Sequence, residues 1–387
     1  MEKVMTIVVI GGGYAGINHI QALKKEFRDE LTRRIRIILV DKNAFHLKKV
    51  TLFKGIVGED VSHLKVPLKQ YCGPDVEFIP GELSSVLPKE QIVHITGEDG
   101  TAKPLHFDRL VLALGSVVQE VNEECGGITL SNLHNAQLIR EELLELTASP
   151  KGTLRVAIIG GGITGIETAG EVCSWLKNDI EEEGMGGKSI EIVLINNKQR
   201  VLEEVPEKIS VRLEQRLRRQ GVIVLHNKRA ERFSNGKITF TDKTELEADA
   251  CVWTVGVTPH PSLQSLGLTV TEQGKVMVDP FYRTKESDSI YAIGDCIHVV
   301  DPVSGKAAAM SCKEAISHGK RLAKIIKAGI QGTKAVSHRT FPDFLCIGLG
   351  PNDAFVWANK WGADFVLTGK LALKIREYTW NAASIIH

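Results

Sequence analysis

The stretch TIVVIGGGYAGINHIQALKKEF, residues 6–27, decides the fold. Its first five residues form an apolar run that is typical of a buried parallel strand. Gly11–Gly16 then carries the GxGxxG spacing, and Ile17–Phe27 has the composition of a helix. A second apolar run follows at Ile35–Val40. A strand, a glycine turn, a helix and a second strand in this order predict a dinucleotide-binding fold.

Each glycine of this turn has its own role in such a fold. Gly11 permits the tight turn, Gly13 lets the backbone approach a pyrophosphate, and Gly16 lets the helix pack closely on the strand. The N-terminus of the helix attracts the phosphates. Asp41, which ends the second strand, is placed to accept a hydrogen bond from a ribose 2′-hydroxyl. The expected cofactor-binding residues of this unit also include Tyr14, Ala15 and Lys42.

The same unit recurs about 150 residues later along the chain. The strand Leu154–Ile159 leads into a second glycine turn and a helix, and the strand Ile190–Ile195 ends at Asn196. Two dinucleotide folds in one chain indicate FAD in one and NADH or NADPH in the other. The alternative is a duplicated scaffold in which one unit binds nothing. The cofactor-binding residues expected here are Gly160, Gly162, Ile163, Thr164, Gly165 and Asn196.

Composition narrows the class of protein. The chain has 387 residues, 43% hydrophobic and 25% charged, with a formal net charge of +1. These values are typical of a soluble globular protein of two or three domains and give no basic field for nucleic acid. Seven scattered cysteines without a CxxC pair favour the cytoplasm. No signal peptide, membrane-spanning run or metal-binding pattern is expected.

Three further segments carry a resemblance to a known family. Phe107–Ser116 (FDRLVLALGS), Cys251–Pro259 (CVWTVGVTP) and Ser289–Cys296 (SIYAIGDC) resemble the crossover, return and late FAD motifs of the pyridine-nucleotide-dependent FAD oxidoreductases. The resemblance covers nearly the whole chain. It implies that Asp295 contacts the ribityl and phosphate region of FAD. The cofactor-binding residues expected in these segments are Ala113, Gly115, Gly256, Gly294 and Asp295.

Within that superfamily, some segments resemble the type II NADH dehydrogenases and the apoptosis-inducing-factor-like, ferroptosis-suppressor-like quinone reductases. Val40–Leu47 resembles their loop near the flavin, and Gly160–Glu171 resembles their nucleotide turn. The helical stretch Val172–Glu183 with Gly184–Gly187 is similar to the type II enzymes. One departure is clear, because Cys312–Ser317 (CKEAIS) lacks both glutamines of their AQxAxQ segment.

The expected fold is therefore α/β, with two Rossmann-like dinucleotide-binding domains and a small C-terminal α+β element. Residues 1–117 and 258–333 are expected to form the FAD-binding domain, and residues 118–257 the inserted NAD(P)H-binding domain. Residues 334–387 are expected to form the C-terminal element. Its segment Leu371–Ile386 allows two interpretations, an ordinary packed element or a short contact with a membrane surface.

Two residues are candidates for a catalytic role. The resemblance implies that Glu167 sits between nicotinamide and flavin and acts in binding and proton transfer, whereas a helix N-terminal charge is the simpler interpretation. Lys313 stands where the glutamine is lost, as a proton or electrostatic partner of the flavin or as a surface lysine. Lys48 and Lys49 border the expected flavin site, either as charges that stabilise the reduced flavin or as solvated loop lysines.

The choice of nucleotide depends on the end of the second strand of the second unit. NADH-specific proteins usually carry an acidic residue there, and this chain has Asn196, followed by Lys198 and Arg200. Asparagine can bond a ribose without repelling a 2′-phosphate, and a nearby base can meet a phosphate. We therefore expect NADPH to be accepted, unless the two bases are only solvated loop charges.

The expected function is that of an FAD-dependent NAD(P)H dehydrogenase with a small-molecule electron acceptor, of which a quinone fits the resemblance best. Two alternatives stay open: a reductase for a ferredoxin or rubredoxin partner, and an NAD(P)H-sensing interaction flavoprotein with little turnover. The sequence is compatible with a cytoplasmic protein that contacts a membrane at its surface. It is also compatible with a homodimer.

Overall fold

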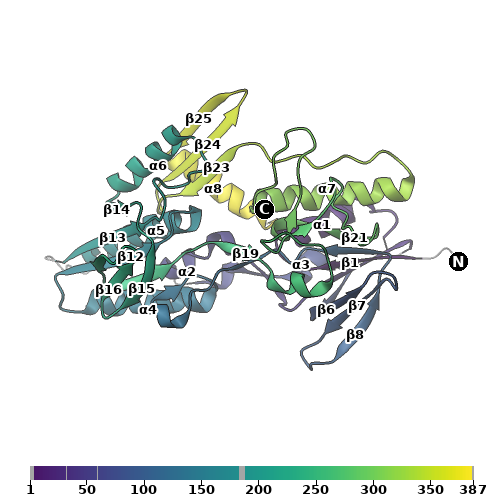
Figure 1. Cartoon of the computed structure of the whole chain (residues 1–387), viewed down its shortest axis with the longest axis horizontal. Helices are drawn as coiled ribbons and strands as arrows, with labels where there is room; N and C mark the ends of the chain where they lie inside the picture. Colours follow the sequence, from purple (N-terminus) through teal and green to yellow (C-terminus); the bar gives the residue numbers. More distant parts are fainter. Residues whose placement is uncertain (1–3, 32, 59, 183–187, 386–387) are drawn as a thin grey trace.

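Two parallel sheets lie side by side in the protein, and the C-terminal element lies against both (Figure 1). The computed structural model describes residues 4–31, 33–58, 60–182 and 188–385. Within these residues, the two sheets have five strands each, and every strand pairing within them is parallel.

The first sheet takes its strands from two distant parts of the chain. Its order is β21-β9-β1-β2-β5. The strands are β1 (Met5–Ile10), β2 (Ile35–Asp41), β5 (Val76–Pro80), β9 (Arg109–Leu112) and β21 (Ile290–Ala292). The side chains of Ile7–Ile10 are buried, as expected for a central strand covered on both faces. The sheet is therefore complete only when the chain returns to it at residue 290.

Two helices pack against each other over this sheet, namely α1 (Tyr14–Glu26) and α7 (Cys312–Gln331). Gly319 permits their close approach, because a Cβ atom there would lie 2.7 Å from the carbonyl oxygen of Ala15. The helix α1 begins three residues earlier than the sequence predicted. The end of the glycine turn is thus already helical, with Gly13 as its N-cap.

Short elements surround the first sheet. The hairpin β3 (Phe45–Leu47) and β4 (Lys65–Pro67) encloses the single turn α2 (Lys54–Val57), and α3 (Leu68–Cys72) follows. An antiparallel sheet of β6 (Glu82–Leu87), β7 (Ile92–Thr96) and β8 (Ala102–His106) projects from one side.

The second sheet repeats the plan of the first within one continuous stretch. Its order is β11-β18-β12-β13-β14. The strands are β11 (Ile128–Thr129), β12 (Thr153–Ile159), β13 (Ser189–Ile195), β14 (Val222–Leu225) and β18 (Ala250–Trp253). Its helices are α4 (Leu133–Ala148), α5 (Ile163–Glu182) and α6 (Glu207–Arg219), and its small antiparallel sheet is β15 (Ala230–Ser234), β16 (Lys237–Phe240) and β17 (Glu245–Glu247).

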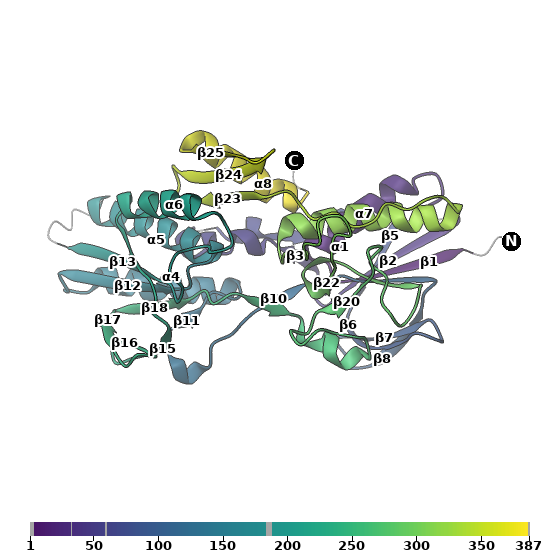
Figure 2. The same cartoon turned by 45° about the horizontal axis from the view of Figure 1, so that its top comes forward.

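A two-stranded link joins the halves. The strand β10 (Ser116–Val118) leaves the first sheet and pairs antiparallel with β19 (Val257–Pro259), which returns to it. Figure 2 shows this link between the two sheets. The pairing holds the outgoing and returning segments together at the level of the strand ends that carry the glycine turns.

The C-terminal element is an antiparallel sheet with one helix. It consists of β23 (Phe344–Gly348), β24 (Ala354–Lys360), β25 (Ala363–Thr368) and α8 (Lys370–Ala383). Figure 2 shows its sheet over the second half of the protein and α8 directed towards the first half. The Nδ2 of Asn18 donates to the carbonyl oxygen of Ala383 at 3.1 Å. The hydroxyl of Tyr71 donates to the carbonyl oxygen of Ser384 at 2.7 Å. The end of α8 is therefore anchored on the first half.

The predicted α/β class, with two Rossmann-like sheets and a C-terminal α+β element, is confirmed. The domain limits stay a prediction. In α8, Ala372 and Trp380 are buried while Leu371 and Tyr378 are exposed. Among the described helices, none is long and apolar enough to cross a membrane. The glycine-rich part of the predicted extension, residues 183–187, lies outside the described residues.

His19 makes the contact between α1 and α7 sensitive to acid. Its ring is fully buried, and its Nδ1 donates to the carbonyl oxygen of Gly319 at 2.9 Å. Burial lowers the pKa of His19 from 6.5 to about 4. The unfolded chain therefore binds this proton first, so the stabilisation is complete above pH 6.5 and is lost as the pH falls towards 4.

We expect the free energy of unfolding, measured by urea titration, to fall between pH 7 and pH 5 by on the order of 1 kcal/mol through this group alone. His19→Gln should remove that share of the pH dependence. His63, which is exposed, supplies the matched control, because His63→Gln should leave the pH dependence unchanged. An equal pH dependence in wild type and His19→Gln would contradict the assignment.

Candidate functional site

The glycines of the first turn are required for two different reasons. A Cβ atom on Gly11 would lie 2.4 Å from the carbonyl oxygen of Ala113, and one on Gly16 would lie 1.8 Å from that of Gly11. We call these two positions closed, because backbone atoms of the protein leave no room for a side chain there. Gly13 differs, because a Cβ atom there would meet no described atom within 4 Å. The turn therefore leaves open space above its third glycine, where a pyrophosphate would lie in a dinucleotide fold.

The helix N-terminus at this turn is suited to an anion. Gly13 has an extended backbone, and its carbonyl oxygen accepts the bond from the amide of Ile17 at 3.0 Å. Among the described residues, no side chain caps α1. The first amides of the helix and the positive end of its dipole therefore point to the open space.

Asp41 is fixed at the end of β2, next to the turn. Its Oδ2 accepts from the amide of Gly12 at 2.6 Å, and its Oδ1 accepts from that of Asn43 at 2.7 Å. Lys42, which the sequence placed in the cofactor site, is exposed, and its Nζ lies 3.3 Å from Oε1 of Glu82. The structure brings Asp41 to the turn and directs Lys42 to the small antiparallel sheet.

The second turn has the same construction. A Cβ atom on Gly160 would lie 2.4 Å from the carbonyl oxygen of Thr254, and one on Gly165 would lie 1.9 Å from that of Gly160. A Cβ atom on Gly162 would meet no described atom within 4 Å. Ile163 and Thr164, which begin α5, are exposed. The second unit thus also keeps open space at its third glycine.

Three polar side chains, those of Ser116, Asp295 and Lys49, gather at the late FAD motif. The hydroxyl of Ser116 donates to Oδ2 of Asp295 at 2.8 Å, and Nζ of Lys49 donates to the carbonyl oxygen of Ser116 at 3.0 Å. Burial raises the pKa of Asp295, which the hydrogen bond from Ser116 and the charge of Lys49 oppose. A Cβ atom on Gly294 would lie 2.9 Å from that of Ala15. Residues 15 and 294 are thus neighbours.

Other predicted cofactor residues lie around this cluster. Gly115 and Gly256, at either end of the β10–β19 link, have φ angles of +66° and +100° and open space at the Cβ position. Tyr14 packs edge-on against His46 at 4.7 Å, and its hydroxyl oxygen accepts from the amide of Val50 at 3.2 Å. Lys48 is buried, and this burial lowers the pKa of its amine.

Glu167 is held by the C-terminal helix. The guanidinium of Arg376 donates from Nε to Oε1 at 2.8 Å and from Nη2 to Oε2 at 2.9 Å, and the amide of Gly348 donates to Oε1 at 2.8 Å. Both charged side chains are buried. Burial raises the pKa of the Glu167 carboxyl group, and the Arg376 guanidinium opposes that shift. The pair joins the second glycine unit to α8.

A second buried carboxylate lies one helical turn further along α5. Glu171 pairs with Lys54 of α2, and the ammonium of Lys54 lies 5.6 Å from the ring centre of Trp380. The guanidinium of Arg376 lies 4.9 Å from the same ring. Two charged pairs close to one indole therefore connect α2, α5 and α8, which come from all three parts of the chain.

Lys313 begins α7 together with Cys312, beside the C-terminal sheet. Its Nζ donates to the carbonyl oxygen of Phe344 at 2.6 Å and lies 4.5 Å from the centre of that ring. Burial lowers the pKa of Lys313. The lysine is therefore only partly exposed, and its charge is directed to the junction between α7 and β23.

The sequence indicated most of these positions but missed the partners that orient them. Arg376 and Trp380 lie in the segment Leu371–Ile386, for which the sequence left two interpretations open, and nothing local indicated that Glu167 pairs with a residue 209 positions away. Ser116 closes the quoted segment FDRLVLALGS, so its place beside the late FAD motif could have been inferred.

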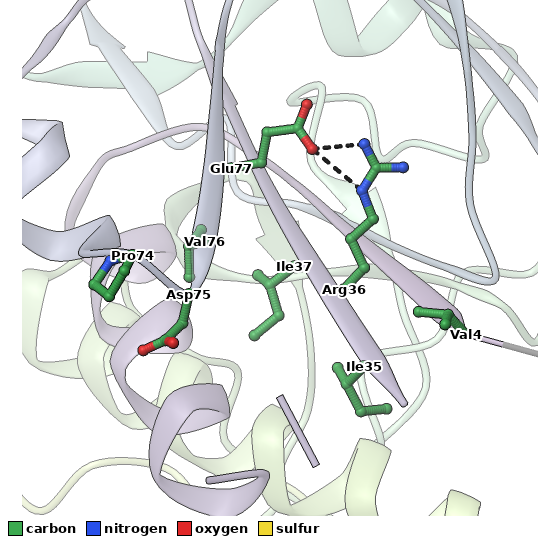
Figure 3. Close-up of a pocket in the computed structure, with 8 residues that line it drawn as sticks. All are labelled: Val4, Ile35, Arg36, Ile37, Pro74, Asp75, Val76 and Glu77. Carbon is green, nitrogen blue, oxygen red and sulfur yellow. Dashed lines mark hydrogen bonds and ion pairs between the residues drawn. The ribbon is translucent and has the colours of Figure 1, made fainter. Parts of the chain in front are cut away.

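A shallow pocket elsewhere is not part of this site. Figure 3 shows it at the N-terminal ends of β2 and β5, with the ion pair Arg36–Glu77 above it. Its lining residues are Val4, Ile35, Arg36, Ile37, Pro74, Asp75, Val76 and Glu77. Dinucleotides bind at the C-terminal ends of parallel strands, so this hollow lies at the wrong edge.

Comparison with known proteins finds three kinds of likeness. Residues 5–319 match the family described as Pyridine nucleotide-disulphide oxidoreductase. The chain is 25% identical over 363 residues to the Type II NADH:quinone oxidoreductase of Haemophilus influenzae, covering 83% of this chain and 80% of that protein. It is 23% identical over 381 residues to the Apoptosis-inducing factor homolog A of Dictyostelium discoideum, covering 92% and 85%.

Among solved structures, NDH2 from Plasmodium falciparum in complex with NADH superposes with a TM-score of 0.82 at 15% identity. The match covers 97% of this chain and 94% of that one. At this identity the likeness concerns the fold.

The two open glycines predict two separable binding defects. Gly13→Val should yield a folded protein that fails to retain FAD, because the side chain would fill the phosphate space without meeting protein atoms. Gly162→Val should retain FAD and raise the KM for NAD(P)H. The measurements are the flavin content of the purified protein, its circular dichroism and its steady-state kinetics. Gly16→Ala is the control for a closed position and should destabilise the fold. Full flavin content in Gly13→Val would contradict the assignment.

The buried pair predicts a coupling between α5 and α8. Arg376→Leu should lower the free energy of unfolding by about 3–5 kcal/mol, because it leaves the Glu167 carboxylate buried and unpaired. Glu167→Leu in the same chain should recover a large part of that loss, as measured by denaturant titration of the four proteins of the cycle. A double variant whose loss equals the sum of the two single losses would show that the two residues act independently.

Proposed function

The chain belongs to the pyridine nucleotide-disulphide oxidoreductase family, and from this we propose that it oxidises NADH or NADPH with bound FAD and passes the electrons to a quinone-like acceptor. The membership confirms the resemblance seen in the sequence, and the protein is an NAD(P)H-dependent flavin oxidoreductase. The nucleotide, the acceptor and the roles of single residues belong to the proposal.

The observation that carries the proposal is the repeated construction of the two glycine turns. In each, the first and last glycines are closed by backbone atoms and the third glycine faces open space. A turn that served only packing would need no space above its third glycine. The first unit, with Asp41 at its strand end, suits the ribose and pyrophosphate of FAD, and the second suits those of the nicotinamide nucleotide.

The residues around the first turn fit FAD. The open cradle at Gly13 would hold the pyrophosphate, and Asp295 with Ser116 would hold the ribityl region. FAD supplies the redox chemistry when bound, by accepting hydride and returning electrons. Lys48 and Lys49 place positive charge at the edge of this region, where it would favour negative charge on the ring.

Glu167 and Lys313 are the proposed catalytic residues, on opposite elements of the site. Glu167, on the first turns of α5, would orient the nicotinamide end of the nucleotide, with Arg376 holding its carboxylate in place. Lys313, at the start of α7, would place a cation or a proton donor on the acceptor side. Its contact with the Phe344 carbonyl group keeps the ammonium at that junction.

Two observations support a quinone-like acceptor. Relatives of the chain carry names that specify it, among them a Type II NADH:quinone oxidoreductase and an internal alternative NAD(P)H-ubiquinone oxidoreductase of Solanum tuberosum. Lys313 lies against the aromatic ring of Phe344, and such a surface would suit a flat apolar ring. The lost glutamines show that any such site is built differently from the AQxAxQ pattern.

The proposal predicts the colour changes of the purified protein. Under anaerobic conditions in a stopped-flow instrument, NADH or NADPH should bleach the visible flavin absorption. The rate of this bleaching should be at least as high as the steady-state turnover rate. A soluble quinone should then restore it, because the electrons leave to the acceptor. Comparison of the two nucleotides gives the preference in the same experiment.

Three other outcomes of this experiment would each contradict a different part of the proposed function. Bleaching without recovery by any quinone would overturn the acceptor and favour a protein partner of the ferredoxin or rubredoxin type. A change in mass on reduction, with slow reoxidation throughout, would favour a sensing role. A folded protein that ignores added FAD would overturn the proposal as a whole.

A further inference from the structure

The side chain of Asn196 is oriented by a chain of hydrogen bonds that begins outside the nucleotide site. Asn196 follows β13 and is buried. Its Nδ2 donates to the carbonyl oxygen of Lys198 at 3.1 Å and to Nδ1 of His226 at 3.1 Å. In turn, Nε2 of His226 lies 2.8 Å from Oε2 of Glu214 on α6.

The direction of each bond follows from the last member. Glu214 also pairs through its other carboxylate oxygen, Oε1, with the guanidinium of Arg218 at 2.8 Å. A carboxylate only accepts, so His226 carries its proton on Nε2 and donates it to Glu214. The Nδ1 atom of a neutral His226 is then an acceptor, and it can be satisfied by the amide nitrogen of Asn196 but not by its oxygen.

This assignment leaves the amide oxygen of Asn196 facing the glycine turn. A Cβ atom on Gly161 would lie 2.5 Å from Oδ1 of Asn196. In the first unit, Asp41 occupies the equivalent place at the end of β2, with an oxygen on the amide of Gly12. Asn196 therefore presents to the ribose the same acceptor that an acidic residue would present.

The nearby bases are engaged within their own loop. Arg200 donates to the carbonyl oxygens of Glu203 and Val205, both at 2.8 Å. Nζ of Lys198 lies 3.6 Å from Oε2 of Glu203, whose other oxygen accepts from the amide of Gln199. A 2′-phosphate would thus meet an acceptor oxygen and a nearby carboxylate. The acceptance of NADPH that the sequence led us to expect stays a prediction, and these contacts are the reason to expect the opposite preference.

We propose that the Glu214–His226 pair fixes Asn196 as a hydrogen-bond acceptor and thereby makes the site selective for the non-phosphorylated dinucleotide, NADH, over NADPH. The ribose 2′-hydroxyl donates to Oδ1, whereas a 2′-phosphate has no proton to donate to that oxygen, and Lys198 and Arg200 already contact acceptors of their own loop. His226 is a positioning residue in this scheme, because it acts through Asn196. The inference rests on the proposed function, since it assigns the nucleotide to the second glycine turn.

The test compares His226→Leu with His226→Gln. Leucine removes one of the two acceptors that the structure gives the Asn196 amide nitrogen and leaves the carbonyl oxygen of Lys198, so the amide is held less firmly and can turn its nitrogen to the ribose. The ratio of kcat/KM for NADH to that for NADPH should fall about tenfold, the value of one hydrogen bond of about 1.4 kcal/mol. Glutamine can donate to Glu214 and accept from Asn196, so His226→Gln should keep the ratio. His134→Leu, an exposed histidine on α4, is the matched control and should keep it also.

Asn196→Asp distinguishes orientation from general damage. A carboxylate offers an oxygen in either orientation, so the NADH preference of Asn196→Asp should survive the addition of His226→Leu. A merely structural role of His226 would lower activity with both nucleotides and leave the ratio unchanged, which would overturn the proposal. A wild-type protein that prefers NADPH would overturn it as well.

Binding measurements separate this proposal from the proposed function. Titration calorimetry with ADP-ribose and with 2′-phospho-ADP-ribose needs no electron transfer. Tighter binding of ADP-ribose, lost in His226→Leu, is the expected result. Equal binding of both ligands would overturn the selectivity while the oxidoreductase stands. Absence of binding by either ligand, in a protein that still retains FAD, would remove the nucleotide from this turn and overturn both.

Discussion

The structure depends on the approach of two pieces of backbone at each glycine turn. A Cβ atom at Gly16 would lie 1.8 Å from the Gly11 carbonyl oxygen, and one at Gly165 would lie 1.9 Å from that of Gly160. No side chain larger than hydrogen fits at such a separation. Because the helix can begin directly after the strand, its first amides stay near the strand ends. The same constraint therefore fixes the packing of each half and opens the phosphate space above the third glycine.

Local sequence was sufficient for the parts of the protein that are built locally. Both glycine units and their strands lie within about 40 residues each, so spacing and hydrophobic runs predicted them. The limits of that approach appear at Glu167. Its partner Arg376 comes from the far end of the chain, in a helix whose composition allowed two interpretations. Whether a charged residue is solvated or paired depends on tertiary contacts, and no periodic pattern encodes them.

Orientation was also beyond the sequence at Asn196. The residue type indicated a ribose contact, but it left open which end of the amide would face the ligand. That choice follows from His226 and Glu214, which lie on a different strand end and a different helix. In the first half the corresponding residue is Asp41. Both oxygens of its carboxylate are acceptors, so either orientation of the side chain presents an acceptor to the ribose. The two halves thus reach similar acceptor geometry by different chemical means.

The first sheet stays incomplete for a large part of the synthesis of the chain, because its strands come from distant parts of the sequence. The second sheet is one continuous stretch of chain, whereas the first waits for β21, which pairs with β9 from 290 onwards. During translation, β9 therefore presents an unpaired parallel edge while the whole second half is made and folded. Open edges of this kind are sites of wrong pairing between chains. The second half of the chain can thus complete its sheet before the first half does, and the N-terminal half is the part whose strand edge stays open longer.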